Sequence, residues 1–313
     1  MQDLQYRNLL VPPSGRVDVV LDTDAFNEID DQFAISYLLC CMDKLNIKGI
    51  CAAPFFNSKS QSPYDGMKKS YDEIIKLLSL AGHDELKSKV FEGSGRFLES
   101  ESTPVPSAAA SFMAALAEQY TQDNPLYIIA IGAITNVASS LLMNPNMKEK
   151  CVIVWLGGHS VHHPHNDEFN LRQDVAAARV VFGCGVPLVQ LPCNDVVDRL
   201  STSRYELEHW LRGKNQLCDY LVDITISEAE SYASGKAWSR VIWDISAIAW
   251  LLNDHGRFMD TVLIHSPIPE YDHRYAQDYR RHLIQYVYRV NRDEVFTDLF
   301  SKLASMPPPT TSK

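Results

Sequence analysis

Five carboxylates stand within ten residues near the start of the sequence, at Asp22, Asp24, Glu28, Asp30 and Asp31. Side chains of like charge at this density repel one another unless a cation or a proton neutralises them. Hard divalent cations take oxygen ligands and often keep positions open for water or substrate. One or two acids could instead favour the start of a following helix through its dipole, but a helix start does not need five. The spacing therefore indicates a cation site.

Amide and carboxylate side chains also follow other segments that the sequence predicts as strands. They are Asn57, Asn136, Glu168 and Asn170. Ligands of open α/β sheets bind beyond the carboxyl ends of the strands. We therefore expect these side chains to lie at the same edge of one sheet as the five carboxylates.

Short β-branched runs alternate with longer helical patterns along the sequence. Strands are expected over residues 16–24, 46–53, 89–91, 126–131, 151–156, 186–191, 260–264 and 283–290. Helices are expected over residues 31–42, 66–80, 107–120, 204–231 and 293–303. Several strands are apolar throughout, which is typical of a parallel sheet that helices cover on both faces. The pattern predicts the α/β class, with an open, mostly parallel sheet flanked by helices and a C-terminal helical layer.

Nothing in the sequence divides the chain into separate units. It has no internal repeat and no linker rich in Gly, Ser or Pro. We expect a single domain over residues 1–313, with flexible ends at 1–15 and 306–313.

Composition excludes several classes of protein. The 313 residues include 29 Lys and Arg against 39 Asp and Glu, a formal charge of −10, which argues against a nucleic-acid partner. Hydrophobic residues make up 46% and charged residues 22%, an ordinary globular balance, and no apolar run approaches the roughly 20 residues of a membrane span. The seven cysteines show no C-x-x-C spacing, and the first residues lack a signal-peptide pattern. These features predict a cytoplasmic protein without a membrane partner.

Taken in order, the motifs resemble the inosine-uridine preferring nucleoside hydrolase family, which is known by an N-terminal D-x-D-x-G-x-D-D signature. The matching pieces here are Asp22-Thr-Asp24 with Asp30-Asp31, Phe56-Asn57, Ile131-Gly-Ala-Ile-Thr-Asn136, Gly157-Gly158, Glu168-Phe-Asn170 and Trp243-Asp244. Each piece stands at an expected strand end or helix start, so their combination is more specific than any one of them. The resemblance extends from Val19 to Phe300.

The resemblance implies an N-ribohydrolase in which calcium holds the ribose diol and a water that attacks the anomeric carbon. Carried over by position, the metal ligands would be Asp24, Asp31, the main-chain carbonyl of Ile131 and Asp244. Asp24 would also be the general base. The ribose hydroxyls would contact Asp30, Asn57, Glu168 and Asn170. Members of the family are usually dimers or tetramers, so the resemblance also implies a homo-oligomer that takes a nucleoside or a related ribosyl compound.

The chain departs from the family pattern in three places. The segment from Asp24 to Asp30 is two residues longer than in the signature and has no glycine, so Asn27 or Glu28 could add a ligand or face solvent. Trp243 replaces the family's histidine, the candidate proton donor to a departing purine. His162 replaces an asparagine that commonly contacts ribose. The changes leave the metal site intact and alter the base pocket, for which the candidates are Trp243, His162, Phe55 and Phe56.

The seven-residue loop from His159 to His165 contains four histidines. They are His159, His162, His163 and His165. Neutral histidine is the commonest metal ligand, so zinc is one interpretation. The spacing does not match a metallohydrolase helix, and a loop of this kind is often a solvated surface. A third interpretation is that one imidazole reaches the leaving base and replaces the missing acid. Trp243 has two interpretations as well, as core packing or as a wall of the base pocket.

Two other functions fit parts of the sequence. Asp22-Thr-Asp24 also resembles the start of a haloacid-dehalogenase-type phosphatase, in which the first Asp is the nucleophile. That family has Thr or Val two residues after the second Asp, where this sequence has Phe26. The third possibility is a non-catalytic, metal-dependent protein that binds ribose or a nucleoside.

Overall fold

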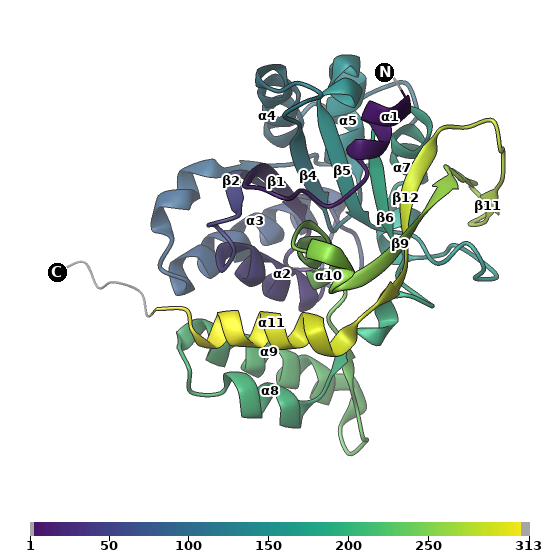
Figure 1. Cartoon of the computed structure of the whole chain (residues 1–313). Helices are drawn as coiled ribbons and strands as arrows, with labels where there is room; N and C mark the ends of the chain where they lie inside the picture. The colour runs from purple at the N-terminus through teal and green to yellow at the C-terminus, as the bar shows by residue number, and fades with distance from the viewer. Residues whose placement is uncertain (1–2, 308–313) are drawn as a thin grey trace.

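The computed structural model describes residues 3–307 and places an eight-stranded sheet at the centre of the molecule (Figure 1). The strand order is β3-β2-β1-β4-β5-β6-β12-β9. In that order the strands are Val90–Glu92, Leu45–Ala52, Val17–Thr23, Leu126–Ala130, Cys151–Leu156, Leu188–Leu191, Leu283–Val290 and Met259–His265. Neighbouring strands pair in parallel, except that β9 runs antiparallel to β12 at one edge. The predicted class, an open and mostly parallel sheet flanked by helices, is confirmed.

Successive residues of a strand point to opposite faces of the sheet, and here apolar residues point to both. Helices therefore cover both faces. In β1, Val19 and Leu21 contribute to one core and Val20 to the other. The first core lies under α2 (Asp30–Leu39), α3 (Pro63–Leu80) and α10 (Ile245–Leu251). The second lies under α4 (Ala108–Leu116), α5 (Thr135–Met143) and α7 (Val175–Gly183).

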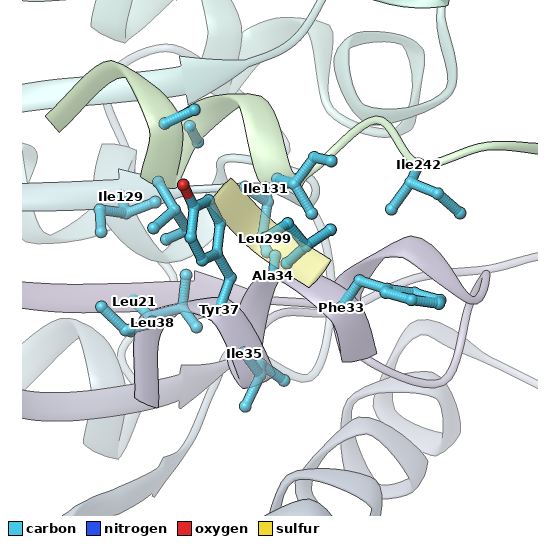
Figure 2. Close-up of a cluster of buried hydrophobic side chains, with 14 of the residues drawn as sticks. Leu21, Phe33, Ala34, Ile35, Tyr37, Leu38, Ile129, Ile131, Ile242 and Leu299 are labelled. Carbon is cyan, nitrogen blue, oxygen red and sulfur yellow. The ribbon is translucent and has the colours of Figure 1, made fainter. Parts of the chain in front are cut away.

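The helix α2 is buried along its whole length, and after its polar first turn its residues are apolar except for Ser36. Figure 2 shows Phe33, Ile35 and Tyr37 of this helix among the side chains of the first core, to which Leu21 and Ile129 of the sheet also belong. A helix packed on all sides cannot shift without opening a void. The start of α2, at Asp30 and Asp31, is therefore held firmly against the end of β1.

The predicted C-terminal helical layer is present and consists of α8 (Arg204–Leu211), α9 (Gln216–Ala233) and α11 (Arg292–Ala304) (Figure 1). The region 204–231 is helical as expected, and two helices, α8 and α9, share it. Gly213, which has a positive φ of 74°, ends the first helical segment, and the Asn215 side chain accepts a hydrogen bond from Cys218 N at 2.8 Å to start the second. Both are local signals that an amphipathic pattern alone does not reveal.

Shorter elements complete the fold. They are α1 (Asp3–Asn8), α6 (Phe169–Gln173), β7 (Ser201–Thr202), β8 (Arg240–Val241), β10 (Ile268–Pro269) and β11 (Tyr275–Ala276), with 3-10 helices at Asp84–Lys89, Ala117–Gln119, Pro145–Glu149, Val197–Arg199 and Asp254–Gly256. The segment 1–15, expected to be flexible, contains α1, in which the Tyr6 hydroxyl donates to the Leu283 carbonyl at 2.8 Å. The expectation for the far end falls mostly on residues 308–313, which lie outside the described residues.

Two further observations concern the chain as a whole. All seven cysteines are free thiols, which agrees with their irregular spacing in the sequence. Within residues 3–307, the helices are all too short or too polar to cross a membrane.

Candidate active site

A cavity of about 290 Å³ opens beyond the carboxyl ends of β1, β4, β5 and β6. Eight of the residues predicted from the sequence line it together: Asp24, Asp30, Asp31, Ile131, Glu168, Asn170, Trp243 and Asp244. They come from segments that are far apart in the sequence and that the parallel sheet brings to one edge. The remaining four predicted residues, Asn57, Phe55, Phe56 and His162, do not line the cavity.

Four aspartates form the floor of the site, and we call Asp24, Asp30, Asp31 and Asp244 the acidic cluster. None of their side chains is more than 4% exposed. One oxygen from each of Asp30, Asp31 and Asp244 lies within 4.8 Å of the others. Asp24 follows β1, Asp30 and Asp31 begin α2, and Asp244 precedes α10. The cluster is thus built by three rigid elements.

The four carboxylates of the acidic cluster repel one another when all are ionised and no cation is bound. Burial, and then the charges of the neighbouring acids, raise the pKa of Asp24, Asp30 and Asp244 well above the usual range. Burial raises the pKa of Asp31 to about 7, although the Thr23 hydroxyl donates a hydrogen bond to it. Among the described residues, no group donates a hydrogen bond to the buried Oδ2 of Asp24. A hard divalent cation would neutralise the cluster and occupy that oxygen, so these residues fit a metal.

The backbone after β4 approaches the acidic cluster closely. A Cβ added to Gly132 would lie 2.8 Å from Oδ1 of Asp24, so only glycine allows this approach. The neighbouring carbonyl of Ile131 accepts a hydrogen bond from Nδ2 of Asn170 at 3.1 Å. This carbonyl therefore lies on the cavity wall in a fixed orientation.

The longer segment between Asp24 and Asp30 folds over the cavity and places Asn27 and Glu28 on its wall. The backbone N–H of Asn27 donates a hydrogen bond to the backbone carbonyl of Asp24 at 2.7 Å, which makes a tight turn. Oε2 of Glu28 lies 2.6 Å from Nη2 of Arg240, and this ion pair holds the segment to β8. Asn57 supports the segment from outside, because its Nδ2 donates to Oδ1 of Asn27 at 2.6 Å.

The loop after β5 is fixed by backbone amides that converge on Glu168. Its two carboxylate oxygens accept hydrogen bonds from Gly158 N, Asn170 N and Leu171 N at 2.8–2.9 Å. Burial nevertheless raises the pKa of Glu168. Asn170 donates to the Ile131 carbonyl and, at 3.2 Å, to the Leu156 carbonyl. Glu168 and Asn170 are therefore held rigidly before any ligand arrives.

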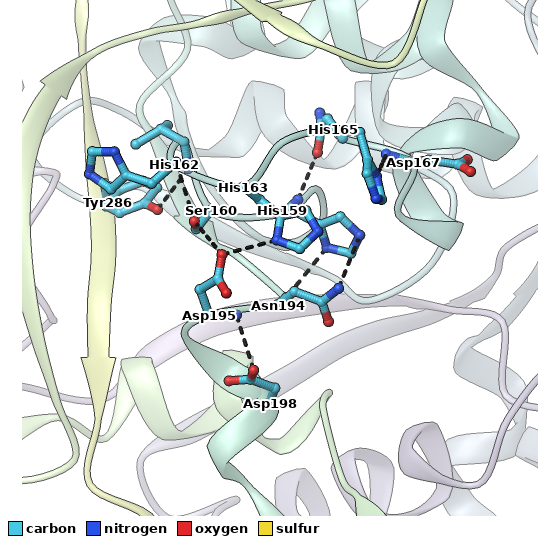
Figure 3. A network of polar contacts seen from close by, with 12 residues as sticks. His159, Ser160, His162, His163, His165, Asp167, Asn194, Asp195, Asp198 and Tyr286 are labelled. Atoms are coloured by element: carbon cyan, nitrogen blue, oxygen red, sulfur yellow. Dashed lines mark hydrogen bonds and ion pairs between the residues drawn. The ribbon is translucent and has the colours of Figure 1, made fainter.

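Three of the candidates for the base pocket lie outside the cavity. Phe55 is fully buried and packs against Gly66, and Phe56, which is 50% exposed, lies in the loop outside the cavity. His162 is exposed, and its ring lies beside Tyr286, apart from the other histidines of its loop (Figure 3). Each follows a strand or sits in a polar loop, but sequence position alone does not fix the direction of a loop side chain. Trp243 does line the cavity and also packs against the first core.

Histidine enters the cavity at a different position, His159, which follows Gly157-Gly158 directly after β5. It is only 7% exposed. Burial, and then the charges of His163 and His165, lower the pKa of His159 to about 4. His159 is therefore a neutral imidazole at ordinary pH.

Asn194 and Arg172 also line the cavity, and the sequence interpretation did not select them. Asn194 follows the end of β6, so the rule that found Asn57 and Asn136 would have found it as well. Arg172 lies in α6, where its guanidinium stacks 5.4 Å from the Phe169 ring centre. A charged helical side chain of this kind carries no sequence signal that separates it from a surface residue.

Comparisons with known proteins identify a family and similar folds. The family described as inosine-uridine preferring nucleoside hydrolase matches residues 19–295. A purine-preferring ribonucleoside hydrolase from Gardnerella vaginalis has a similar structure, with 19% identity, a TM-score of 0.73 and coverage of 92% of this chain and 98% of that one. A plant nucleoside hydrolase is similar at 17% identity and a TM-score of 0.72, with coverage of 92% and 99%. The type III effector protein XopQ, complexed with adenosine diphosphate ribose, is similar at 15% identity and a TM-score of 0.64, with coverage of 96% and 97%. A search of curated proteins found no match.

Proposed function

The chain belongs to the inosine-uridine preferring nucleoside hydrolase family, whose members are N-glycosyl hydrolases, and on this premise we propose that it uses calcium and water to release ribose from a ribonucleoside. The single observation that carries the proposal is the acidic cluster. Four buried aspartates and the carbonyl of Ile131 face one cavity, and Oδ2 of Asp24 has no hydrogen-bond donor among the described residues. Such a set of oxygens suits a hard cation and an oxygen-rich substrate.

The proposed metal ligands are Asp24, Asp31, the Ile131 carbonyl and Asp244. When bound, calcium would lower the pKa of a water molecule and hold the ribose diol. Asp24 would accept the proton of the attacking water as general base. Positive charge develops on the ribosyl group as the bond to the base breaks, and the ring of carboxylates favours that charge.

Asp30, Glu168 and Asn170 would hold the ribose hydroxyls. The hydrogen bonds that fix Glu168 and Asn170 support this role, because a preorganised site loses little freedom when the sugar binds. Asn57, which the resemblance assigns to ribose, lies outside the cavity and would act through Asn27. We therefore propose Asn27 as the amide that faces the substrate in this chain.

The base would lie between Trp243 and His159, the aromatic residues that border the cavity with Phe169. The indole of Trp243 offers a stacking surface. His159 offers a ring nitrogen that could relay a proton from water to the leaving base.

The geometry argues against the phosphatase alternative. Asp22 would be its nucleophile, but this side chain is fully buried and accepts a hydrogen bond from Asn136 Nδ2 at 2.8 Å. It does not line the cavity. Only a measurement of turnover distinguishes the non-catalytic binding protein from the hydrolase.

The test is hydrolysis of a panel of purine and pyrimidine nucleosides, measured as ribose release, with adenosine diphosphate ribose as a further ribosyl compound whose cleavage is measured as release of adenine. We expect release with calcium present, and a loss of about 10²- to 10⁴-fold in kcat for Asp24→Asn because the general base is removed. Asp254→Asn is the matched control, since this exposed carboxylate pairs with Lys44 on the surface. Equal turnover of Asp24→Asn and wild type would contradict the mechanism. Nucleoside binding by calorimetry without ribose release would identify the non-catalytic protein.

Two coarser expectations accompany this proposal. We propose a dimer or tetramer, which light scattering after gel filtration would measure. We also propose the cytoplasm as the compartment, consistent with seven free thiols, and fractionation of the source cells would test it.

A further inference from the structure

Three of the four histidines in the loop after β5 converge, and we call His159, His163 and His165 the imidazole cluster. Each offers a ring nitrogen within 4.8 Å of the others. The ring centre of His163 lies 4.6 Å from the ring centre of His159 and 4.8 Å from that of His165. Figure 3 shows the three rings together and His162 turned away from them. Such convergence within one short loop is not needed for packing, because His165 is exposed to solvent.

We propose that the imidazole cluster is a binding site for a first-row transition metal of the zinc class, separate from the acidic cluster. Three neutral imidazoles are a common protein ligand set for Zn²⁺ and leave a fourth position for water. Nitrogen ligands favour such metals over calcium, which takes oxygen. The two clusters therefore select different cations, although His159 of the imidazole cluster lines the same cavity as the acids.

The hydrogen bonds around the cluster support coordination. Nδ1 of His163 lies 3.1 Å from Oδ2 of Asp195, which fixes the proton on Nδ1 and leaves the lone pair of Nε2 for a metal. Ser160 Oγ donates to the same oxygen at 2.9 Å and holds Asp195 in place. A carboxylate behind a metal-binding histidine is the usual arrangement that orients the ring.

The other two rings are only weakly engaged. The contacts of His159 with Asn194, and of His165 with Asp167 N, are all 3.4 Å long, at the outer limit of hydrogen bonding. These rings can therefore exchange the contacts for a metal with little loss. Because the same loop carries Glu168 and Asn170, a metal bound here would also fix the cavity wall.

The test uses Zn²⁺ alone as the probe, added to chelator-treated protein with calcium in large excess so that the acidic cluster is occupied. Competition with a chromophoric zinc chelator should give one zinc ion per chain in wild type. We expect His165→Gln and His163→Gln to weaken binding at least tenfold, and Asp195→Asn to weaken it by about 10- to 100-fold as an orienting partner. Asn tolerates the positive φ of 72° at position 195, so this variant keeps the backbone.

His162→Gln is the matched control, because it removes an imidazole from the same loop but not from the cluster. It should bind zinc as wild type does. Zinc should also raise the Tm of wild type and His162→Gln but not of His165→Gln, whose exposed side chain can be changed without unfolding the protein. Equal zinc affinity in wild type and His165→Gln would overturn the proposal, as would zinc binding that disappears in Asp244→Asn with the imidazoles intact.

Discussion

The acidic cluster lines the cavity, the imidazole cluster reaches it through His159, and the two are assembled in different ways. The acids come from the end of β1, the start of α2 and the residue before α10, and the fold buries all four. The imidazoles come from one loop of seven residues and range from buried His159 to exposed His165. The acids are costly without a proton or a cation, whereas neutral imidazoles carry no charge to compensate.

Because of this difference, we expect the acidic cluster to require a bound cation and the imidazole cluster to bind one optionally. The fold holds the acidic cluster together against its own repulsion, so a cation there should contribute to the stability of the whole domain. The imidazole cluster can persist without metal, so a metal there should contribute less to stability than the cation at the acidic cluster. Four experiments would break or sharpen this contrast.

The largest effect is expected for Asp244→Asn. Removing one carboxylate from the acidic cluster should lower ribose release by about 10³-fold, because the metal contributes several kcal/mol of charge stabilisation in the transition state. Calcium affinity, measured by calorimetry, should fall with it. Zinc affinity at the imidazole cluster should stay within about twofold, and a parallel loss of both would mean that the two clusters form one site.

The next effect concerns pH and metal removal. Burial raises the pKa of Asp22 and of Asp31 to about 7, so these groups keep their protons in the folded state while the unfolded chain has lost them. The stability of the metal-free protein should therefore fall as the pH rises from about 4 to about 7. A shift of this size is worth up to about 4 kcal/mol for one fully buried group, since one pKa unit is about 1.4 kcal/mol.

Calcium should make this pH dependence shallower, because the cation takes the place of the proton on the acidic cluster. Thermal unfolding in chelator and in calcium across this range would measure it. Asp22→Asn should remove part of the slope in both conditions, since it does not belong to the cluster and Asn can still accept from Asn136. Identical slopes with and without calcium would show that the acids are not the cation site.

A smaller effect is expected for Trp243→Ala. Loss of a stacking surface worth about 1–3 kcal/mol should raise KM for nucleosides roughly 10- to 100-fold, with calcium and zinc content nearly unchanged. Trp243→Phe should restore much of the affinity. A large drop in Tm without a change in KM would instead assign Trp243 to core packing, in line with its contacts to the first core.

The smallest effect is expected for Glu28→Gln, which removes one of the two carboxylates paired with Arg240, the other being that of Glu228. Because the Glu28 side chain is partly exposed, the ion pair should contribute less than about 1 kcal/mol to stability. Calcium affinity should fall by no more than a few-fold, since one negative charge near the cluster is lost. Calorimetry would measure both, and a change as large as that of Asp244→Asn would make Glu28 a metal ligand.

The sequence predicted the sheet well because its strands are short apolar runs separated by helical patterns. It also predicted most of the cavity, since Asp24, Glu168 and Asp244 stand next to strand ends or helix starts that the topology brings together. It failed where side-chain direction matters. Phe55 and Phe56 are adjacent in the chain, yet one is buried in the core and the other faces solvent.

The histidine loop shows the same limit. Four imidazoles in seven residues are visible in the sequence, but only the backbone of the loop decides that three converge and that His162 does not. The helix α10 is not among the expected helices, because its seven residues, all apolar except Ser246, fit a strand as well as a buried helix. Periodicity locates elements, and it does not orient the side chains of loops.

The distribution of the acidic cluster along the chain has a consequence for synthesis. Asp24, Asp30 and Asp31 leave the ribosome early, and Asp244 follows only after most of the sheet has been made. A growing chain therefore holds three crowded carboxylates without the fourth that completes the set. On the function proposed above, tight binding of calcium and cleavage of a nucleoside would both arise only once translation has passed α10.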